Sequence, residues 1–581
     1  MALEQEKAAS ASAGASSGGD GPLRKKAGVL LAGAGIFTLV LFLYLKTLAP
    51  TVLYLQDPKL LDAVMLQMQV SVLGITHPTG YPTYMMLTHL FTYLPLGDPA
   101  YRVNLASAVY AALAVAAVYA AGLLLSRRVV AAASGALAFG LGTALWSQAV
   151  IAEVYTLNAL LVSLTIVVLL LWREYQRDRY LLLSAFLVGL CLTNHLTSGL
   201  LLPASLLLVA LVDWRKLVDV RLVLGGAGLF MLGLTPYLYL PIRAAMDPPM
   251  DANNPTNLER FWYVVSGGNL TGSFFSFGPS ELPGRMIFYF EHLLDNTHLL
   301  VAMVALTGAV ILLLRDRAVG IFLGFLYFGW LLYALENDIP DVDIYFIPTY
   351  LVLSLWAAAG FGTLLDETES LISGFPRVSK GAILGVLWAM VLFLPLLGVG
   401  GTYAKVDMSG VYRGREEIEA VAQNAAPNAT ILHHRSSMWY MVLVERRRRD
   451  LTIVDPFFHN TDVSYADLVW PADIDLATTD RRYGTDDLSG VSAAKKAAKK
   501  GRVYLLDQGS AHPGRFRNAG FEVVTVKAGL LYELVPPGRE PYSPPSASRH
   551  SAAEHCLSAS SCAWSRCSSS GEAVAYSLCS S

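Results

Sequence analysis

Long apolar stretches dominate residues 28–400 of this chain, and short loops separate them except for two longer connections, at residues 49–100 and 241–296. A run of roughly 17–25 apolar residues is long enough to cross the hydrocarbon core of a bilayer as a helix. Hydrophobic residues make up 54% of the chain and charged residues only 15%, a balance outside the habit of soluble proteins. The sequence therefore predicts a mainly α, polytopic membrane protein with about 11 transmembrane helices. The predicted spans are residues 28–48, 101–125, 129–147, 155–172, 180–194, 196–212, 222–241, 297–314, 318–336, 344–363 and 381–400, of which 180–194 and 196–212 are short.

Arginine and lysine gather in alternate loops between these stretches. Short cytoplasmic loops carry the excess of these residues in membrane proteins, and one topology places every such loop of this chain on the cytoplasmic side. The first stretch is full-length and lacks a small-residue cleavage site, which favours an anchor over a removed signal peptide. We therefore predict an integral protein of a bacterial plasma membrane, with its C-terminus outside. The positive loops are residues 24–26, 127–128, 173–179, 215–221, 315–317 and 377–380.

Four parts are expected along the chain. Residues 1–23 are rich in Ala, Ser and Gly and predict a disordered cytoplasmic N-terminus, and residues 24–400 form the transmembrane domain. In residues 401–540, strand-like runs such as 430–432 alternate with helical stretches, which predicts a small extracytoplasmic α/β domain. Residues 541–581 are Ser-rich and predict a disordered tail. The net charge of −2 gives no reason to expect a nucleic-acid partner.

The first outer loop carries an acid that is unusual in its surroundings. Asp57 precedes a proline and suits a helix N-cap. Asp62 follows in what we expect to be the second turn of an apolar helix that lies along the membrane surface. An acid there indicates a partner or a function, although a solvated surface acid is the alternative. The run His77-Pro-Thr-Gly-Tyr81-Pro then breaks the helix; His77 could donate to a phosphate or be an interfacial residue, and Tyr81 suits an interfacial aromatic.

Other polar residues fall in the remaining outer turns. Glu153 is flanked by apolar residues rather than by turn formers, and Asn194 with His195 occupies another hairpin, where a hydrogen-bonded structural histidine is the alternative. Arg243, at a predicted membrane boundary, could clamp a phosphate with its planar guanidinium or extend toward lipid headgroups. A short turn at residues 336–343 holds four acids, Asp338 and Asp341 among them, which could bind a divalent cation or simply be solvated. No cofactor is certain, and the spacing identifies no metal.

These same segments resemble a family of multi-span membrane proteins that is widespread in bacteria. The family includes an animal protein O-mannosyltransferase of the endoplasmic reticulum that acts on plexin-type domains. It is similar to the C-class glycosyltransferases, which take a sugar from a polyprenyl-phosphate carrier at the non-cytosolic membrane face. The motifs follow the family's order and are HPTGYP at 77–82, WSQAVIAEVYTLNALL at 146–161, TNHLTSGLLLP at 193–203, YLPIRAAMDPP at 239–249 with NNP at 253–255, and NDIPDVDIYFIP at 337–348.

One departure from the family pattern concerns its first outer loop. That loop usually reads Asp-Ser-Gly-Glu-Leu, beginning fifteen residues before the histidine of the HPxGYP motif. Asp62 stands at the aspartate position of this chain, but Met65 replaces the glutamate. If the family uses that glutamate in chemistry, this chain relies on Asp62 alone or recruits another acid such as Glu153.

The resemblance implies a glycosyltransferase that moves a sugar, with mannose as the candidate, from a polyprenyl-phosphate donor to a hydroxyl of a protein or glycan. We expect Asp62 to act as the general base, with inversion at the anomeric carbon, and Glu153 to orient the acceptor or sugar. The leaving phosphate would be held by Arg243 with His77 or His195. Membrane lipids would surround the spans. Acceptor or sugar contacts are expected from Tyr81, Asn194, Asp338 and Asp341.

Two other classes of protein remain open on the sequence alone. A transporter or flippase for lipid-linked sugars would need polar groups near the bilayer midplane, whereas the ionisable residues here gather toward one face. A non-catalytic sensor with an outer receptor domain would need one or two spans rather than about 11.

Overall fold

The structure is a computed structural model that describes residues 22–54, 60–273, 275–339, 341–434, 437–455, 476–478, 490–507 and 513–542. The two segments predicted to be disordered, 1–23 and 541–581, lie outside these residues except for 22–23 and 541–542, and the expected cap Asp57 also lies outside them. All elements described below belong to one unit, residues 1–540.

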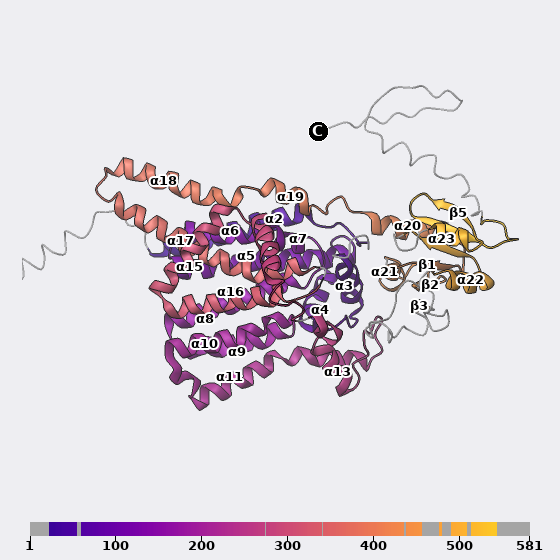
Figure 1. Cartoon of the computed structure of the whole chain (residues 1–581), viewed down its shortest axis with the longest axis horizontal. Helices are drawn as coiled ribbons and strands as arrows, with labels where there is room; N and C mark the ends of the chain where they lie inside the picture. Colours follow the sequence, from indigo (N-terminus) through magenta and orange to yellow (C-terminus); the bar gives the residue numbers. More distant parts are fainter. Residues whose placement is uncertain are drawn as a thin grey trace, which may run out of the picture. The chain divides into compact units, whose positions relative to one another are not determined.

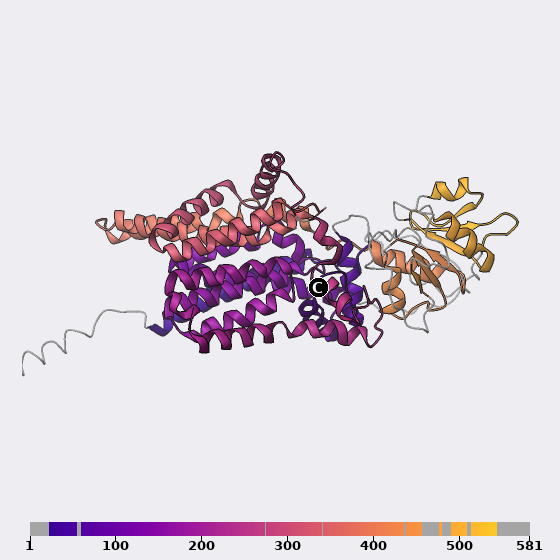
Figure 2. The same ribbon diagram turned by 60° about the horizontal axis from the view of Figure 1, so that its bottom comes forward.

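Every apolar stretch predicted to span the membrane is helical, and the helices lie side by side in one bundle (Figures 1 and 2). Eight described helices are long and apolar enough to cross a bilayer, or up to 10 if each of two bent pairs counts as one span. The predicted stretch 180–194 falls on α9, whose 15 residues make it shorter than these. The main helices are α2 (Pro22–Thr47), α5 (Pro99–Ser126), α6 (Val129–Gly140), α7 (Thr143–Ala149), α8 (Tyr155–Tyr175), α9 (Asp178–Leu192), α10 (Leu201–Asp213), α11 (Val220–Gly233), α15 (Leu299–Arg315), α16 (Arg317–Leu335), α17 (Ile347–Leu371) and α18 (Arg377–Phe393).

Short helices extend or connect these spans. The bent pairs are α6 with α7, at 64°, and α14 with α15, at 111°. The connecting elements are α3 (Leu61–Val72), α4 (Pro82–His89), η2 (Leu90–Tyr93), η3 (Leu196–Leu200), η4 (Trp214–Leu217), η5 (Thr235–Leu238), α12 (Tyr239–Ala244), α13 (Leu258–Val265), η6 (Gly268–Ser273), α14 (Leu282–Asn296), η7 (Val342–Phe346), η8 (Leu394–Leu396) and α19 (Val399–Val406).

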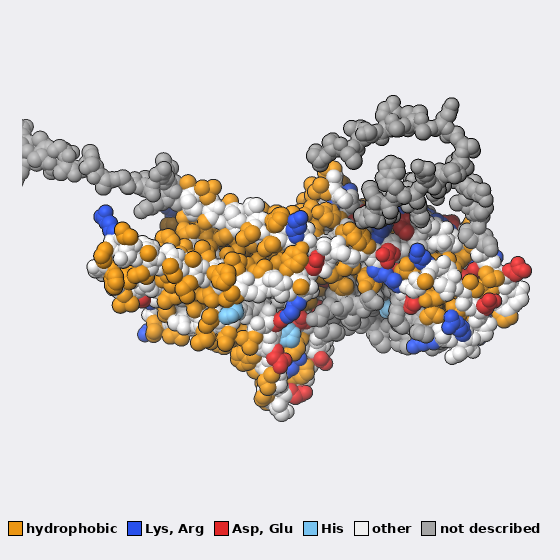
Figure 3. All heavy atoms as spheres, turned by 90° about the horizontal axis from the view of Figure 1, so that it is seen from above, with side chains coloured by type: hydrophobic (Ala, Val, Ile, Leu, Met, Phe, Trp, Pro, Cys, Tyr) orange, Lys and Arg blue, Asp and Glu red, His pale blue; other side chains and the backbone are white. Residues whose placement is uncertain are grey.

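The centre of the bundle is α17. In the apolar part of the span Val342–Leu371, which contains α17, 94% of the residues are buried, whereas in that of the span Arg377–Val406, which contains α18, only 6% are buried. Close packing in a membrane depends on small residues at helix contacts. A Cβ on Gly308 of α15 would overlap the carbonyl oxygen of Trp356 in α17, and one on Gly189 of α9 would overlap that of Phe230 in α11. Hydrophobic side chains cover much of the bundle surface in Figure 3, as expected of a face in contact with lipid.

Ion pairs join the positive loops from 127–128 onward at one end of the bundle. Arg128 lies 2.6 Å from Asp366, near the end of α17, and Arg173 lies 3.2 Å from Asp316. Lys216 lies 2.8 Å from Asp178. These pairs bring the positive loops together, as the single predicted topology requires.

A small mixed sheet follows the last span, as predicted for an α/β domain. Its strand order is β3-β2-β1-β4-β6-β5; the first four strands are parallel, and β6 pairs antiparallel with both β4 and β5. The strand-like run 430–432 recognised in the sequence is β1. The elements are α20 (Arg413–Asn424), β1 (Thr430–Leu432), α21 (Met438–Leu443), β2 (Thr452–Asp455), β3 (Leu476–Thr478), α22 (Val491–Lys500), β4 (Val503–Leu506), α23 (Pro513–Asn518), β5 (Glu522–Lys527) and β6 (Leu531–Val535).

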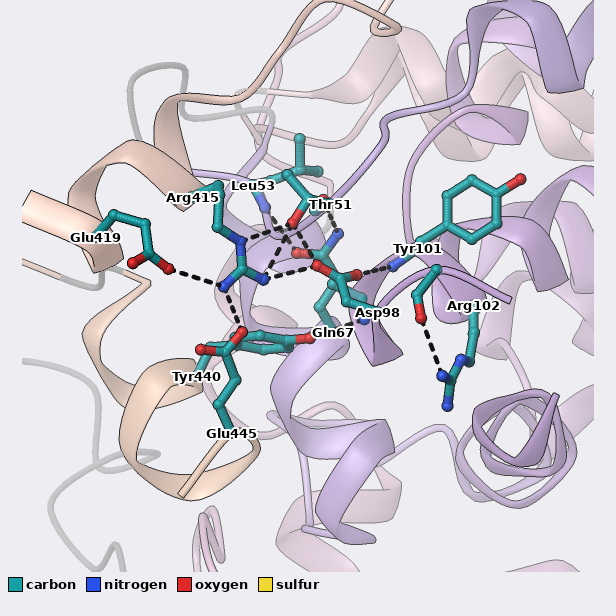
Figure 4. Close-up of polar contacts among 12 residues, drawn as sticks. Thr51, Leu53, Gln67, Asp98, Tyr101, Arg102, Arg415, Glu419, Tyr440 and Glu445 are labelled. Carbon is teal, nitrogen blue, oxygen red and sulfur yellow. Dashed lines mark hydrogen bonds and ion pairs between the residues drawn. The ribbon is translucent and has the colours of Figure 1, made fainter. Parts of the chain in front are cut away.

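One arginine joins this domain to the end of the bundle opposite the positive loops (Figure 4). Arg415 of α20 donates through Nη2 to Asp98 Oδ2 at 2.7 Å, contacts Thr51 Oγ1 at 3.3 Å, and pairs with Glu445 of its own domain. Asp98 uses its other oxygen, Oδ1, to cap α5 by accepting from the backbone N–H of Tyr101 at 2.8 Å. A single carboxylate therefore both starts a membrane span and anchors the C-terminal domain.

Two further contacts support this junction. A Cβ on Gly414 would overlap the carbonyl oxygens of Val52 and Leu53, so the backbone of α20 packs directly on the first outer segment. The hydroxyl of Tyr440 accepts from the backbone N–H of Ala100 at 3.0 Å.

The predicted orientation can be tested by cysteine labelling. We expect an impermeant maleimide applied to intact cells to label Lys495→Cys on α22 but to reach Arg177→Cys, in a positive loop, only after permeabilisation. Both positions are exposed, and the cysteines within residues 541–581 would be replaced by serine in the parent. The reverse labelling pattern would invert the whole topology.

Candidate active site

Asp62, His77 and Tyr81 lie together at the end of the bundle that carries the C-terminal domain. The Asp62 carboxylate lies 3.6 Å from His77 Nε2, and the Tyr81 hydroxyl lies 3.2 Å from the same nitrogen. His77 Nδ1 is 3.2 Å from Thr76 Oγ1. The side chain of Asp62 is 38% exposed and that of His77 15%. A partly accessible carboxylate is thus held beside an imidazole and a phenol.

The local fold explains the position of Asp62 and corrects two expectations. The described part of α3 begins at Leu61, so Asp62 lies in the first turn of this helix, where the helix dipole stabilises negative charge. Residues 63–70 are all buried, so α3 is covered by protein and does not lie along the membrane surface. The burial extends to its polar residues: Gln67 and Gln69 are fully buried, and each makes a hydrogen bond to the protein that offsets the cost of burial.

His195 forms the second part of the site, among aromatic rings. Its ring lies 6.1 Å from that of Tyr81 in a stacked arrangement, 5.3 Å from Tyr155 and 5.6 Å from Tyr345. Burial, aided by His77, lowers the pKa of His195 to about 4. Its Nδ1 accepts from the backbone N–H of Thr197 at 3.3 Å. The neutral ring therefore carries its proton on Nε2, which makes that atom a hydrogen-bond donor.

Glu153 lies in the turn between α7 and α8 and is only 3% exposed. Burial raises its pKa well above the ordinary value, and the negative charges of Asp62 and Asp341 raise it further. Three carboxyl groups from distant segments therefore influence one another. Such carboxyl groups, held in different environments, separate into acidic and basic roles.

Asn194 and Tyr81 also belong to this group. Asn194 donates from Nδ2 to the carbonyl oxygen of Val154 at 3.3 Å, which holds the α9–η3 turn against the turn that carries Glu153. Its Oδ1 is buried and has no hydrogen-bond partner among the described residues. An acceptor of this kind suits a ligand hydroxyl.

Arg243 of α12 hydrogen-bonds to the C-terminal end of α3. It donates from Nε to the carbonyl oxygen of Leu73 at 2.9 Å and from Nη2 to that of Val72 at 3.5 Å. Both carbonyls are at the C-terminal end of α3, where a cation is favourable. No described contact joins Arg243 to Asp62, and Nη1 reaches only the sulfur of Met246 at 3.6 Å.

The acidic turn at 336–343 divides between two locations. Asp341 interacts electrostatically with Glu153 and Tyr81, whereas Asp338 is exposed and its backbone N–H donates to Ser273. Among the described residues, no group of three His, Cys, Asp or Glu side chains could hold a metal ion.

Two aromatic residues of this site, Tyr155 and Tyr345, are not among the site residues predicted from the sequence. They lie 5.8 Å apart. Both belong to segments that carry the family resemblance, which is the signal that could have pointed to them. A contact between turns far apart in the chain has no local pattern by which a single sequence reveals it.

Comparison with known proteins matches residues 62–218 to the family model described as Protein O-mannosyl-transferase TMEM260 N-terminal domain. Protein O-mannosyl-transferase TMEM260 of Mus musculus is 29% identical over 187 residues, which cover 30% of this chain and 26% of the mouse protein. The match thus spans about a quarter of the length of that curated relative.

Solved structures agree in fold. ArnT of Cupriavidus metallidurans bound to undecaprenyl phosphate superimposes with a TM-score of 0.58 over 89% of this chain and 99% of ArnT, at 13% identity. The apo form of the same protein gives a TM-score of 0.53 at 13% identity.

These observations define a multi-span membrane protein with the fold of ArnT, followed by a small α/β domain. Within it, the segment 62–218 matches the family model of the TMEM260 N-terminal domain, in agreement with the resemblance that the motifs indicate.

The raised pKa of Glu153 predicts a pH-dependent stability. An acid whose pKa is raised by folding contributes stability that is present below its ordinary value, about 4.3, and is lost as the pH rises through the raised pKa. Glu153→Gln stays neutral at every pH. We therefore expect its thermal unfolding midpoint in detergent to rise relative to the parent as pH increases, with no such gain below about pH 4.

A matched control is Glu259→Gln, which alters an exposed acid of α13. Its offset from the parent should not change with pH. A pH-independent offset for Glu153→Gln as well would contradict the assignment of a buried, neutral glutamic acid.

Proposed function

We propose that this protein is a glycosyltransferase that moves a sugar from a polyprenyl-phosphate donor to an acceptor hydroxyl at the outer membrane face. The observation that carries the proposal is the Asp62–His77 pair beside the neutral donor His195, at one end of a C-class fold. The matched segment 62–218 contains all three residues. The names of the relatives support a lipid-phosphate donor and a protein acceptor, since ArnT binds undecaprenyl phosphate and the mouse protein is an O-mannosyl-transferase.

In this proposal Asp62 accepts the proton of the attacking hydroxyl. It combines partial exposure with a position in the first turn of α3, where negative charge is stabilised. A base positioned in this way contributes about 10²–10⁴-fold to the rate. Attack from the face opposite the phosphate inverts the anomeric carbon, and mannose is the sugar we favour because of the relative's name.

The leaving phosphate needs hydrogen-bond donors. His195 offers a neutral Nε2–H, and His77 has its Nε2 3.6 Å from the Asp62 carboxylate and 3.2 Å from the Tyr81 hydroxyl. Glu153, held neutral, can donate a hydrogen bond to the sugar or to the phosphate. Asn194 and Tyr81 supply polar contacts, and Asp341 orients the sugar from the opposite segment. Asp338 remains a candidate only for contact with the acceptor molecule, because its side chain is exposed.

The first test of the proposal is Asp62→Asn. Asparagine keeps the size and polarity of the side chain but cannot take the proton, so we expect turnover to fall by about a hundredfold or more with protein abundance unchanged. The assay uses purified protein with a panel of polyprenyl-phosphate sugars and measures sugar transfer to acceptor hydroxyls. The exposed Asp407→Asn is the matched control. Full activity of Asp62→Asn would exclude it as the base, and absence of transfer from every donor by the parent would reject the proposed function.

Arg243 is tested separately. Lysine keeps the charge and can cap α3 but loses the planar fork. If Arg243 holds the leaving phosphate, Arg243→Lys lowers kcat more than it raises KM for the donor, since the clamp acts as the bond breaks. The contacts with Val72 and Leu73 lead us to expect instead that Arg243→Lys retains kcat within about threefold, less than the loss expected for a bidentate clamp. A large loss of kcat in a stably folded variant would instead support the role of Arg243 in holding the leaving phosphate.

A further inference from the structure

A polar cavity of about 660 Å³ lies where the outer end of the bundle meets the C-terminal domain. Its walls come from the C-terminal end of α3, from α4 and η2, and from α21 with the loop that follows it. Arg446, Arg449, His89, Thr92 and Ser71 are among the lining residues, and none of the described lining residues is an acid. None of the candidate active-site residues lines it, so the cavity is separate from that site.

The arginines belong to a run of four, residues 446–449, whose members divide into two kinds. Arg447 pairs with Glu419 at 2.6 Å, and Arg448 pairs with Asp450 at 2.9 Å. These two inner arginines hold the loop to the fold. The two outer arginines are the ones that line the cavity.

Arg446 is the clearest case of the second kind. Its side chain is exposed, and within the described residues it makes no hydrogen bond or ion pair. Its backbone adopts a left-handed conformation, with φ of 56°, that residues other than glycine adopt at a cost. The flanking backbone N–H groups of Glu445 and Arg447 donate to Tyr440 and Met441, which holds the loop in this conformation. The fold therefore orients a charged side chain into the cavity without supplying its counter-charge.

His89, the other ionisable residue named above, does not supply the counter-charge of Arg446. Its Nδ1 lies 2.7 Å from the carbonyl oxygen of Val70, and its Nε2 lies 3.1 Å from the hydroxyl of Tyr93. Both ring nitrogens are engaged in the protein. The charge that no described residue of the cavity pairs with is therefore that of Arg446.

The cavity adjoins a surface suited to the membrane interface. Thr92 of η2 lines the cavity, while Leu90 and Tyr93 of the same short helix are 60% and 74% exposed. Leu94 and Leu96 extend this exposed apolar surface. Tyrosines beside exposed leucines are typical of the headgroup level of a bilayer. Lipid headgroups are therefore the chemical groups that lie next to the cavity and could enter it.

We propose that this cavity binds the phosphate group of an anionic membrane lipid, with Arg446 and Arg449 as its ligands. Guanidinium groups form paired, charge-assisted hydrogen bonds with phosphate oxygens. A volume of this size suits a headgroup as well as a phosphate ion. The site is independent of the sugar-transfer reaction proposed above.

The experiment compares the full-length parent with the Arg446→Gln, Arg449→Gln double variant in nanodiscs. One set holds phosphatidylcholine alone, and the other an equal mixture of phosphatidylcholine and phosphatidylglycerol; a third arm titrates inorganic phosphate in uncharged detergent. Thermal stabilisation and retained lipid, detected by native mass spectrometry, are the readouts. The control is the Lys495→Gln, Lys499→Gln double variant, which removes the same charge from the exposed face of α22.

We expect phosphatidylglycerol to be retained by the parent and by the lysine control, and to be bound at least about tenfold more weakly by the arginine variant, since each charge-assisted hydrogen bond contributes about that factor. Stabilisation by inorganic phosphate as well would support a phosphate site that does not need the lipid chains. Equal lipid retention by the arginine variant, or an equal loss in the lysine control, would overturn the proposal. So would binding of a polyglutamate peptide with no response to either phosphate source.

Discussion

The end of the bundle that carries the C-terminal domain depends on one buried amide, that of Gln67. Its Oε1 accepts from the backbone N–H of Leu53 at 2.9 Å, and its Nε2 donates to Asn104 of α5 at 2.8 Å. Asn104 in turn donates to the carbonyl oxygen of Ala49 at 3.0 Å. A polar group in a low-dielectric interior must be hydrogen-bonded, so this amide fixes α3 against both the first span and α5. The position of Asp62, five residues earlier on α3, follows from that attachment.

The same logic governs the electrostatics of the candidate site. Asp62, Glu153 and Asp341 come from three segments and face one another where little water reaches Glu153. Burial and the negative charges of Asp62 and Asp341 all raise the pKa of Glu153, the most buried of the three, and so favour its protonated form. His195 is also buried, and burial disfavours its charged form, so its pKa is lowered to about 4.

Features that depend on local sequence could be predicted. The apolar stretches became helices, the positive loops met at one end, and the strand-like runs formed one sheet. Asp62, His77, Tyr81 and His195 were singled out because polar groups in outer turns stand out against apolar neighbours. Predictions that needed tertiary contacts were less secure. Nothing in the sequence indicates that Arg243 would cap α3 at Leu73, 170 residues away, or that buried glutamines would allow α3 to be covered by protein. The candidate spans number eight to 10 against about 11 predicted, and the predicted stretch 180–194 is absent from that number because α9 has only 15 residues.

The junction drawn in Figure 4 has a mechanical consequence. The chain enters the α/β domain after α19, where Met408 donates to the carbonyl oxygen of Thr47, and Arg415 fastens the start of α20 to Asp98. A rigid body held at two points can still turn about the line that joins them. The contact of Tyr440, on α21, with Ala100 supplies a third point. A displacement of the domain away from the bundle therefore breaks attachments at three places in the chain rather than at one.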